Sequence, residues 1–99
     1  MLNEKMIKAL EEKGFNRWTK GNYDRMYVNA TTLGLECSYY KTGNISSAYW
    51  CDERISNSQG YRLKVAKTYI DVKTGKLHSD HDWLREKANE ILAEVSAIA

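Results

Sequence analysis

Proline is absent from the 99 residues, and cysteine occurs only twice. Without proline no rigid linker divides the chain, and its length suits one domain, since domains usually have roughly 50–250 residues. We therefore expect a single domain over residues 1–99. No apolar run approaches the ~20 residues of a membrane-spanning helix, and the first residues lack the apolar stretch of a secretory signal. These absences favour a cytoplasmic protein that does not enter a membrane.

Sequence motifs of catalysis are missing as well. The six glycines are dispersed among turns, so there is no glycine-rich phosphate loop. Neither Cys37 nor Cys51 stands beside a base, and no serine follows the strand-to-helix pattern of a hydrolase. We therefore expect a protein that is not an enzyme and that has no cofactor.

The residues nearest to a metal-ligand pattern are His78 and His81, with Asp80 and Asp82 beside them. A structural zinc site needs four ligands, and the two cysteines lie far away in the sequence. Acidic residues in the first turn of a helix also interact favourably with the positive end of the helix dipole. We interpret the cluster as a helix cap and predict no metal, with a metal site as the alternative.

Charge is distributed unevenly along the chain, although the net charge is only +2. From Arg54 to His78, six basic residues face the single acid Asp71, whereas five acids face two bases from Ser79 onward. A basic middle segment is typical of a polyanion-binding face. A lysine-rich strand edge that prevents aggregation has the same composition, so both interpretations stay open.

Helical patterns occupy both ends of the chain. Leu2, Met6, Ile7 and Leu10 share one helical face, which predicts a helix over about residues 3–13, with Asn3 as the cap and Gly14 as the stop. Ser79, followed three residues later by Asp82, predicts the start of a second helix. The apolar face expected for that helix consists of Leu84, Ala88, Ile91, Leu92, Val95 and Ile98, with Trp83 at its margin.

Strand patterns fill the region between the helices. Gly21-Asn22 separates residues 15–20 from 23–28, as in a two-residue hairpin turn. A second hairpin is expected around residues 41–44, and residues 61–72 form a third run with a bulge near Ala66-Lys67. The fold class predicted is α+β, an antiparallel β-meander with an N-terminal and a C-terminal α-helix packed on one face. Residues 33–72 form the centre of this meander.

The central hairpin has a predicted register. If Thr42 and Gly43 form its loop, Tyr40 lies opposite Ile45 and Cys37 opposite Ala48. One face, expected to be core, collects Leu33, Leu35, Cys37, Ala48 and Trp50. The other face, expected to be largely solvent-exposed, collects Gly34, Glu36, Ser38, Tyr40, Ser47, Tyr49 and Cys51.

Cations and aromatic residues alternate between residues 17 and 27. Such a mixture can stack on bases while it neutralises phosphates. In the interpretation that we adopt, Trp18 and the tyrosines on one side of the strands belong to the core, and the cations face water. Stacking on bases is the alternative.

Three segments, at residues 17–21, 39–45 and 68–72, resemble a group of short uncharacterised proteins from phages and mobile elements of Gram-positive bacteria. The resemblance implies a setting in which small proteins bind nucleic acid or block a host protein. The order of elements is also similar to double-stranded-RNA-binding domains, but Asp80 and Asp82 stand where that family has lysines. It is similar as well to the amino-terminal DNA-binding domain of transposon integrases, without a shared motif.

We expect a non-enzymatic binding domain whose open, basic and tyrosine-rich sheet face binds nucleic acid. The residues predicted to form this face are Tyr40, Tyr49, Arg62, Lys64 and Lys67. The alternative function is a protein-interaction or inhibitor module that binds a host protein through the tyrosines. No pattern in the sequence specifies an oligomeric state.

Overall fold

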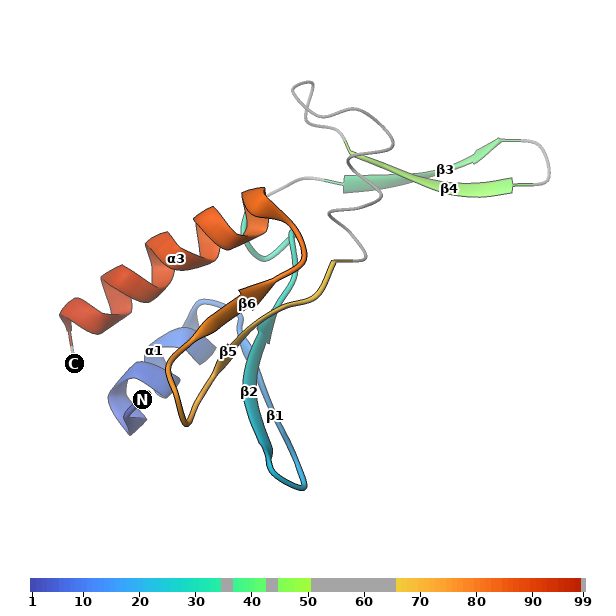
Figure 1. The fold of residues 1–99 in the computed structure, drawn as a ribbon. Coiled ribbons are helices and arrows are strands. Elements are labelled where there is room, and N and C mark those ends of the chain that lie inside the picture. Colours follow the sequence, from blue (N-terminus) through green and yellow to red (C-terminus); the bar gives the residue numbers. More distant parts are fainter. Residues whose placement is uncertain (35–36, 43–44, 51–65, 99) are drawn as a thin grey trace.

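The computed structural model describes residues 1–34, 37–42, 45–50 and 66–98 (Figure 1). Within residues 37–42 and 45–50 it describes the strand pairing alone. The elements, in chain order, are α1 (Glu4–Glu12), β1 (Asn16–Lys20), β2 (Tyr23–Val28), β3 (Cys37–Thr42), β4 (Ile45–Trp50), β5 (Thr68–Asp71), β6 (Leu77–Ser79) and α3 (Asp82–Ala97).

The main sheet is antiparallel, with the strand order β1-β2-β5-β6. β2 is central and pairs Met26 with Ile70 of β5, while β5 pairs Tyr69 with His78 of β6. Both terminal helices lie on the same side of this sheet (Figure 1). The predicted α+β class, with an antiparallel sheet and the two terminal helices on one face, is confirmed.

The composition of the meander differs from the prediction. β3 and β4 form a separate two-stranded sheet, and β5 returns to pair with β2. The expectation that residues 33–72 form the centre of one meander is therefore wrong. β2 and β5 pair because both segments bury two apolar residues on the helix side of the sheet. These residues are Met26 and Val28 in β2, Ile70 in β5, and Val72 directly after β5. β6 was not predicted.

The hairpin expected around residues 41–44 is present as β3 and β4. Its register pairs Thr42 with Ile45 and Cys37 with Trp50, so the predicted pairs Tyr40–Ile45 and Cys37–Ala48 are wrong by two residues. A shift of two residues preserves the alternation of side chains along a strand. Residues therefore share a face of the hairpin as predicted, although the loop begins one residue later. The second turn, at residues 57–60, and the first part of the third run, at 61–65, lie outside the described residues.

Helix α1 follows the prediction closely. The Asn3 side chain accepts a hydrogen bond from the backbone N–H of Met6 at 2.9 Å, which caps the first turn. At the other end Gly14 has φ +96°, and the N–H groups of Gly14 and Phe15 donate to the carbonyls of Glu11 and Leu10. This is a Schellman motif, which satisfies two carbonyls that the helix itself leaves without partners.

Helix α3 begins three residues later than the predicted cap. His81 is the N-cap, and its Nδ1 accepts a hydrogen bond from the backbone N–H of Trp83 at 3.1 Å. The predicted cap Ser79 instead ends β6, where its hydroxyl lies 2.9 Å from that of Thr68. α3 ends at Ala97, so Ile98, predicted to lie on the buried face, is 64% exposed.

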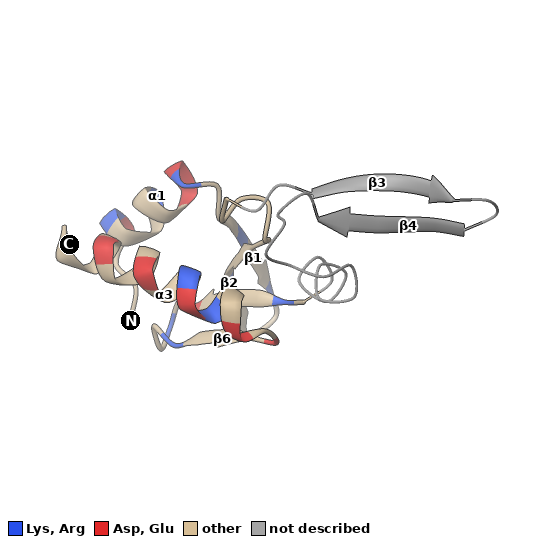
Figure 2. Ribbon diagram, turned by 90° about the horizontal axis from the view of Figure 1, so that it is seen from above, with Lys and Arg blue, Asp and Glu red and all other residues tan. Residues whose placement is uncertain are grey.

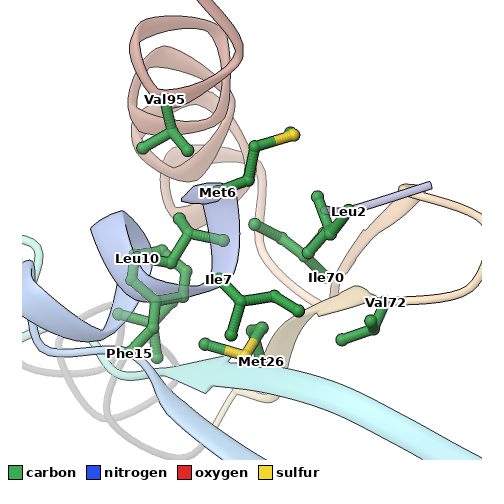
Figure 3. Packing of buried hydrophobic residues seen from close by; sticks show 10 residues of the cluster. Leu2, Met6, Ile7, Leu10, Phe15, Met26, Ile70, Val72 and Val95 are labelled. Carbon is green, nitrogen blue, oxygen red and sulfur yellow. The ribbon is translucent and has the colours of Figure 1, made fainter. Parts of the chain in front are cut away.

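The core lies between the two helices and one face of the main sheet (Figure 3). The predicted apolar face of α1 is entirely buried, and α3 contributes Leu84, Ala88 and Val95. The main cluster consists of Leu2, Met6, Ile7, Leu10, Phe15, Met26, Val28, Ile70, Val72 and Val95. At roughly 1.5–3 kcal/mol for each large apolar side chain, burying this cluster is a main source of the free energy that holds the helices on the sheet.

Acidic and basic residues are interspersed along α1 and α3 (Figure 2). Lys13 lies 3.2 Å from Glu94, an ion pair that connects the two helices at their exposed sides, and Lys87 lies 3.8 Å from Glu90. The helix side of the protein is thus a surface of mixed charge. No helix in the described part of the chain is long and apolar enough to cross a bilayer.

Candidate functional site

The side of the main sheet that faces away from the helices carries aromatic residues. The register places Trp18 beside Arg25, and Tyr27 beside Tyr69, on this side. Trp18 is 43% and Tyr23 is 53% exposed. We define the open face as Trp18, Tyr23, Arg25, Tyr27, Tyr69 and His78.

Four rings of the open face form a row across the sheet, one from each strand. The ring centroids of Trp18 and Tyr27 are 6.2 Å apart in an edge-to-face arrangement, and those of Tyr27 and Tyr69 are 5.2 Å apart. His78 stacks on Tyr69 at 5.0 Å. We call Trp18, Tyr27, Tyr69 and His78 the aromatic row. Such contacts orient the rings, because aromatic pairs within about 7 Å attract one another beyond their buried area.

Arg25 lies beside the row with its guanidinium held between two rings. Its Cζ is 4.1 Å from the ring centroid of Tyr23 and 4.2 Å from that of Tyr69. It also donates a hydrogen bond to the Tyr27 hydroxyl at 3.1 Å, and this bond raises the pKa of Arg25. Its Nε is buried and has no hydrogen-bond partner among the described residues. The open face therefore holds a fixed positive charge among its aromatic rings.

The interpretation that Trp18 belongs to the core is wrong. β1 is an edge strand, and all five of its residues are exposed. The core position next to β1 is filled by Phe15, which precedes the strand and is 2% exposed. Trp18 can therefore point away from the helices and contact Tyr23, with ring centroids 6.4 Å apart.

A recess at the β1 end of the aromatic row has a volume of about 340 Å³. Asn16, Arg17, Trp18 and Tyr27 line it. Its walls thus combine two aromatic rings with the exposed side chain of Asn16. Planar groups with polar edges fit such a combination, because rings stack on their faces while an amide bonds to their edges.

An ion pair connects β1 to β2. Arg17 donates two hydrogen bonds to the carboxylate of Asp24, from Nε to Oδ1 at 2.9 Å and from Nη2 to Oδ2 at 2.8 Å. These bonds lower the pKa of Asp24 and raise that of Arg17. The bidentate geometry fixes the direction of the guanidinium, which places Arg17 at the margin of the recess.

Charges of both signs surround the row. Alternation along the strands places Lys20, Lys67 and Lys76 on the same side of the sheet as the open face, and all three are exposed. Asp71 and Asp80 lie on that side as well. A hydrogen bond from the backbone N–H of Thr74 lowers the pKa of Asp71, which keeps its carboxylate charged. With Arg25, the side has four cations against two acids.

The residues predicted for the site are only partly described. Tyr40 in β3 and Tyr49 in β4 share one face of the hairpin by register. Arg62 and Lys64 lie outside the described residues. Lys67 is exposed and its backbone pairs with Asp80, whose N–H donates to the Lys67 carbonyl at 3.1 Å. Of the five predicted residues, Lys67 is the one that the structure places beside the aromatic row.

Tyr69 and His78 were missed by the sequence analysis. The signal for Tyr69 was its position next to Ile70, because neighbouring residues of a strand face opposite sides. Thr68 and Ile70 are both buried on the helix side of β5, so Tyr69 faces away from the helices. His78 was considered only as a cap or metal ligand. His81 forms the cap, and no group of three metal-ligating side chains occurs within the described ranges.

Comparisons with protein-family models, with curated proteins and with solved structures give no match.

Proposed function

We propose that this protein binds single-stranded nucleic acid through the open face of its main sheet. One observation carries the proposal: an uninterrupted row of four rings crosses a sheet face that no described element covers, with the guanidinium of Arg25 fixed beside it. Every base has an aromatic face, so rings of this kind hold bases of any sequence. Cations beside the rings neutralise the phosphates.

Single strands fit this face better than duplexes. In a duplex the base faces are stacked on one another, whereas unpaired bases can be splayed out onto aromatic side chains. Exposed sheets with two or three aromatic residues are a common platform for such binding. Stacking and charge neutralisation need no reacting group, so the proposed role is non-enzymatic. A cytoplasmic protein of a phage or mobile element is the setting that we propose for it.

The electrostatic contribution should be moderate. With two to four phosphate contacts from Lys20, Arg25, Lys67 and Lys76, log Kd should rise with log salt concentration with a slope of about 1.4 to 2.8 for single strands. The hairpin residues Tyr40 and Tyr49, together with Arg62 and Lys64, remain proposed contributors to the same ligand. Their loss would add to the effects of changes on the open face.

The test is fluorescence anisotropy with labelled single-stranded and double-stranded DNA and RNA over a range of salt concentrations. We expect single strands to bind more tightly than duplexes. Trp18→Ala should weaken binding about 5- to 150-fold, because stacking on one ring contributes about 1–3 kcal/mol per base. Tyr27→Phe, which keeps the ring, should weaken binding much less.

Matched lysine variants control for non-specific charge effects. Lys20 lies on the side of the open face, whereas Lys8 is an exposed lysine of α1 on the other side of the sheet. Lys20→Ala should reduce both affinity and salt dependence, and Lys8→Ala should change neither. Binding that is absent for all four nucleic acids, or that is independent of salt, would refute the proposal.

A protein partner is the alternative function. Its supporting observation is composition: tryptophan, tyrosine and arginine, the residue types of the open face, are those enriched at interaction hot spots. The presence of both cations and acids around the row also suits a protein surface. Capture of one stoichiometric protein from cells of the natural host, unaffected by nuclease and lost in Trp18→Ala, would favour this alternative.

A further inference from the structure

We propose that the recess at Asn16 holds one unpaired base of the bound strand, with the base stacked on Trp18 and hydrogen-bonded at its edge to the Asn16 amide. The proposal rests on the single-strand binding proposed above. It places the base-binding site at the β1 end of the open face and names Asn16 as the residue that bonds to the base.

The ring of Trp18 is more accessible to a base than the ring of Tyr69. The Arg25 guanidinium lies 4.2 Å from the centroid of Tyr69, and His78 stacks on the same ring at 5.0 Å, so Tyr69 already has a cation and a stacking partner. Trp18 is 43% exposed. Its centroid is 6.4 Å from that of Tyr23 with the rings nearly parallel, so the two rings are displaced sideways and overlap little. Base stacking is therefore expected first at Trp18.

Trp18 and Tyr27 form a corner of the recess. Their ring planes meet at 81°, with the centroids 6.2 Å apart. A flat ring that stacks on Trp18 therefore meets Tyr27 edge to face, and both arrangements are favourable for aromatic rings. The volume of about 340 Å³ is at the lower end of the range of about 300–1,000 Å³ for small-ligand sites. This size and shape fit one base.

Asn16 supplies the polar part of the recess. It is the cross-strand partner of Tyr27, which places it on the same side of the sheet as the rings. It is exposed, and its side-chain amide forms no hydrogen bond with the described residues. An amide has two N–H donors and a carbonyl acceptor, which match the donors and acceptors at a base edge. A hydrocarbon side chain of a protein partner would offer this amide no hydrogen bond, so a base is the better occupant.

The charge of the recess also favours a base over a phosphate. Of the described residues that line it, Arg17 is the charged one, and two hydrogen bonds of 2.8 and 2.9 Å connect it to the carboxylate of Asp24. An uncharged base leaves this ion pair intact. Lys20 is exposed on the same side of β1 as Trp18, and Arg25 is the cross-strand partner of Trp18. The phosphates next to the bound base should therefore lie toward Lys20 and Arg25.

Abasic oligonucleotides test the recess by isothermal titration calorimetry at low salt. One ligand is an octanucleotide made entirely of tetrahydrofuran abasic sites, and the other is the same strand with a single adenine. Both strands have the same phosphates, so the ratio of their dissociation constants isolates the contribution of one base. We expect the adenine to increase affinity about 5- to 150-fold, the range for stacking of one base.

Substitutions in the recess locate the bound base. Trp18→Ala should reduce the ratio nearly to one, and Asn16→Ala should reduce it about 2- to 10-fold, as expected for the loss of a hydrogen bond. Asn89→Ala, at an exposed asparagine of α3, is the matched control and should not change the ratio. Lys20→Ala should weaken both strands by the same factor. A merely structural role of Asn16 would likewise weaken both strands equally and would leave the ratio intact.

A free nucleotide is another source of the same chemistry. Adenosine monophosphate has the base but lacks the further phosphates that would contact Lys20 and Arg25. We expect it to bind much more weakly than the strand with one adenine. Adenosine monophosphate that binds as tightly as this strand would overturn a strand as the source of the base.

The outcomes separate the recess from the proposed function. Equal affinity for the two abasic strands, or a ratio that both Trp18→Ala and Asn16→Ala leave intact, would overturn the recess as the base site, while tight binding of an ordinary single strand would leave the proposed function standing. Absence of binding to every single strand would overturn both.

Discussion

Gly14 permits a quantitative test of the fold. Its φ is +96°, and a Cβ at this position would lie 2.5 Å from Cγ2 of Thr32. Gly34 has φ +98°, and no atom of the described residues lies within 4 Å of the place its Cβ would take. Alanine at either site adopts the same left-handed backbone, but only at Gly14 does it meet a neighbour. The difference between the two variants therefore isolates the steric contact.

The magnitudes follow from this geometry. A left-handed alanine costs about 1–2 kcal/mol, offset in part by about 0.4–1 kcal/mol from the less flexible unfolded chain. We expect Gly34→Ala to lower the free energy of unfolding by about 1 kcal/mol. At Gly14 the side chain of Thr32 must also move. Its Oγ1 lies 3.0 Å from Oδ1 of Asn29, so rotation breaks a hydrogen bond that contributes about 0.5–1.5 kcal/mol. Gly14→Ala should thus lose about 0.5–1.5 kcal/mol more than Gly34→Ala.

Urea denaturation monitored by circular dichroism measures both changes. Thermal unfolding should show an extra decrease in Tm of about 4–8 °C for each kcal/mol in a domain of this size. Thr32→Ser removes Cγ2 and keeps the hydroxyl, so it should restore most of the extra loss in the Gly14→Ala background. Equal destabilisation by Gly14→Ala and Gly34→Ala, or failure of Thr32→Ser to restore stability, would refute the packing described for the end of α1.

Three further predictions concern the core, the second helix cap and an ion pair. Ile70 is fully buried, so Ile70→Ala should cost about 2–5 kcal/mol and Ile70→Val about 0.5–1.5 kcal/mol in urea denaturation, and equal costs would contradict its place in the core. His81→Ala should lower the free energy of unfolding by about 0.5–2 kcal/mol, whereas His81→Asn should preserve it, because asparagine also accepts the hydrogen bond from Trp83. Arg17 lowers the pKa of Asp24, so this carboxylate stabilises the fold above its unfolded pKa and the stabilisation is lost as the pH falls. Asp24→Asn should therefore be less stable than the wild type at pH 7, and the difference should shrink as an acid titration followed by circular dichroism proceeds below about pH 4. A difference that is constant with pH would show that the ion pair does not contribute.

The helices were predictable because their signals are local. In α1 the spacing of the apolar residues, the cap Asn3 and the stop Gly14 all agree within about fifteen residues of sequence. The cap of α3 was misplaced for a reason that is not local. Ser79 is a good cap by residue type, but in the fold its hydroxyl contacts Thr68 of β5, which leaves the cap to His81.

The pairing of the strands could not be derived in the same way. β2 and β5 are separated by about forty residues, and their pairing depends on which apolar faces meet under the helices. The hairpin predicted around residues 41–44 is present, with its register shifted by two residues, but the local pattern does not show which sheet it joins. β6 has three residues and a single apolar side chain, Leu77, which is too short a pattern to detect.

Part of the candidate site could be predicted from the sequence. Stacking on bases was one interpretation of the cations and aromatic residues at 17–27, but the core interpretation of Trp18 was preferred. Whether Trp18 is buried depends on whether β1 is a central or an edge strand, and β1 is an edge strand whose five residues are all exposed. Tyr69 and His78 complete the row only through the pairing of β5 with β2 and β6, which is the long-range step that the sequence pattern lacks.

The most direct test of the open face is a nuclear magnetic resonance titration of the isotope-labelled protein with a single-stranded tetranucleotide. We predict that the largest shifts occur at the open face, in the indole signal of Trp18, the guanidinium of Arg25 and the rings of Tyr27, Tyr69 and His78, while α1 and α3 are nearly unchanged. Shifts confined to the helices, or to the hairpin at residues 37–50, would contradict the assignment of this face as the binding site.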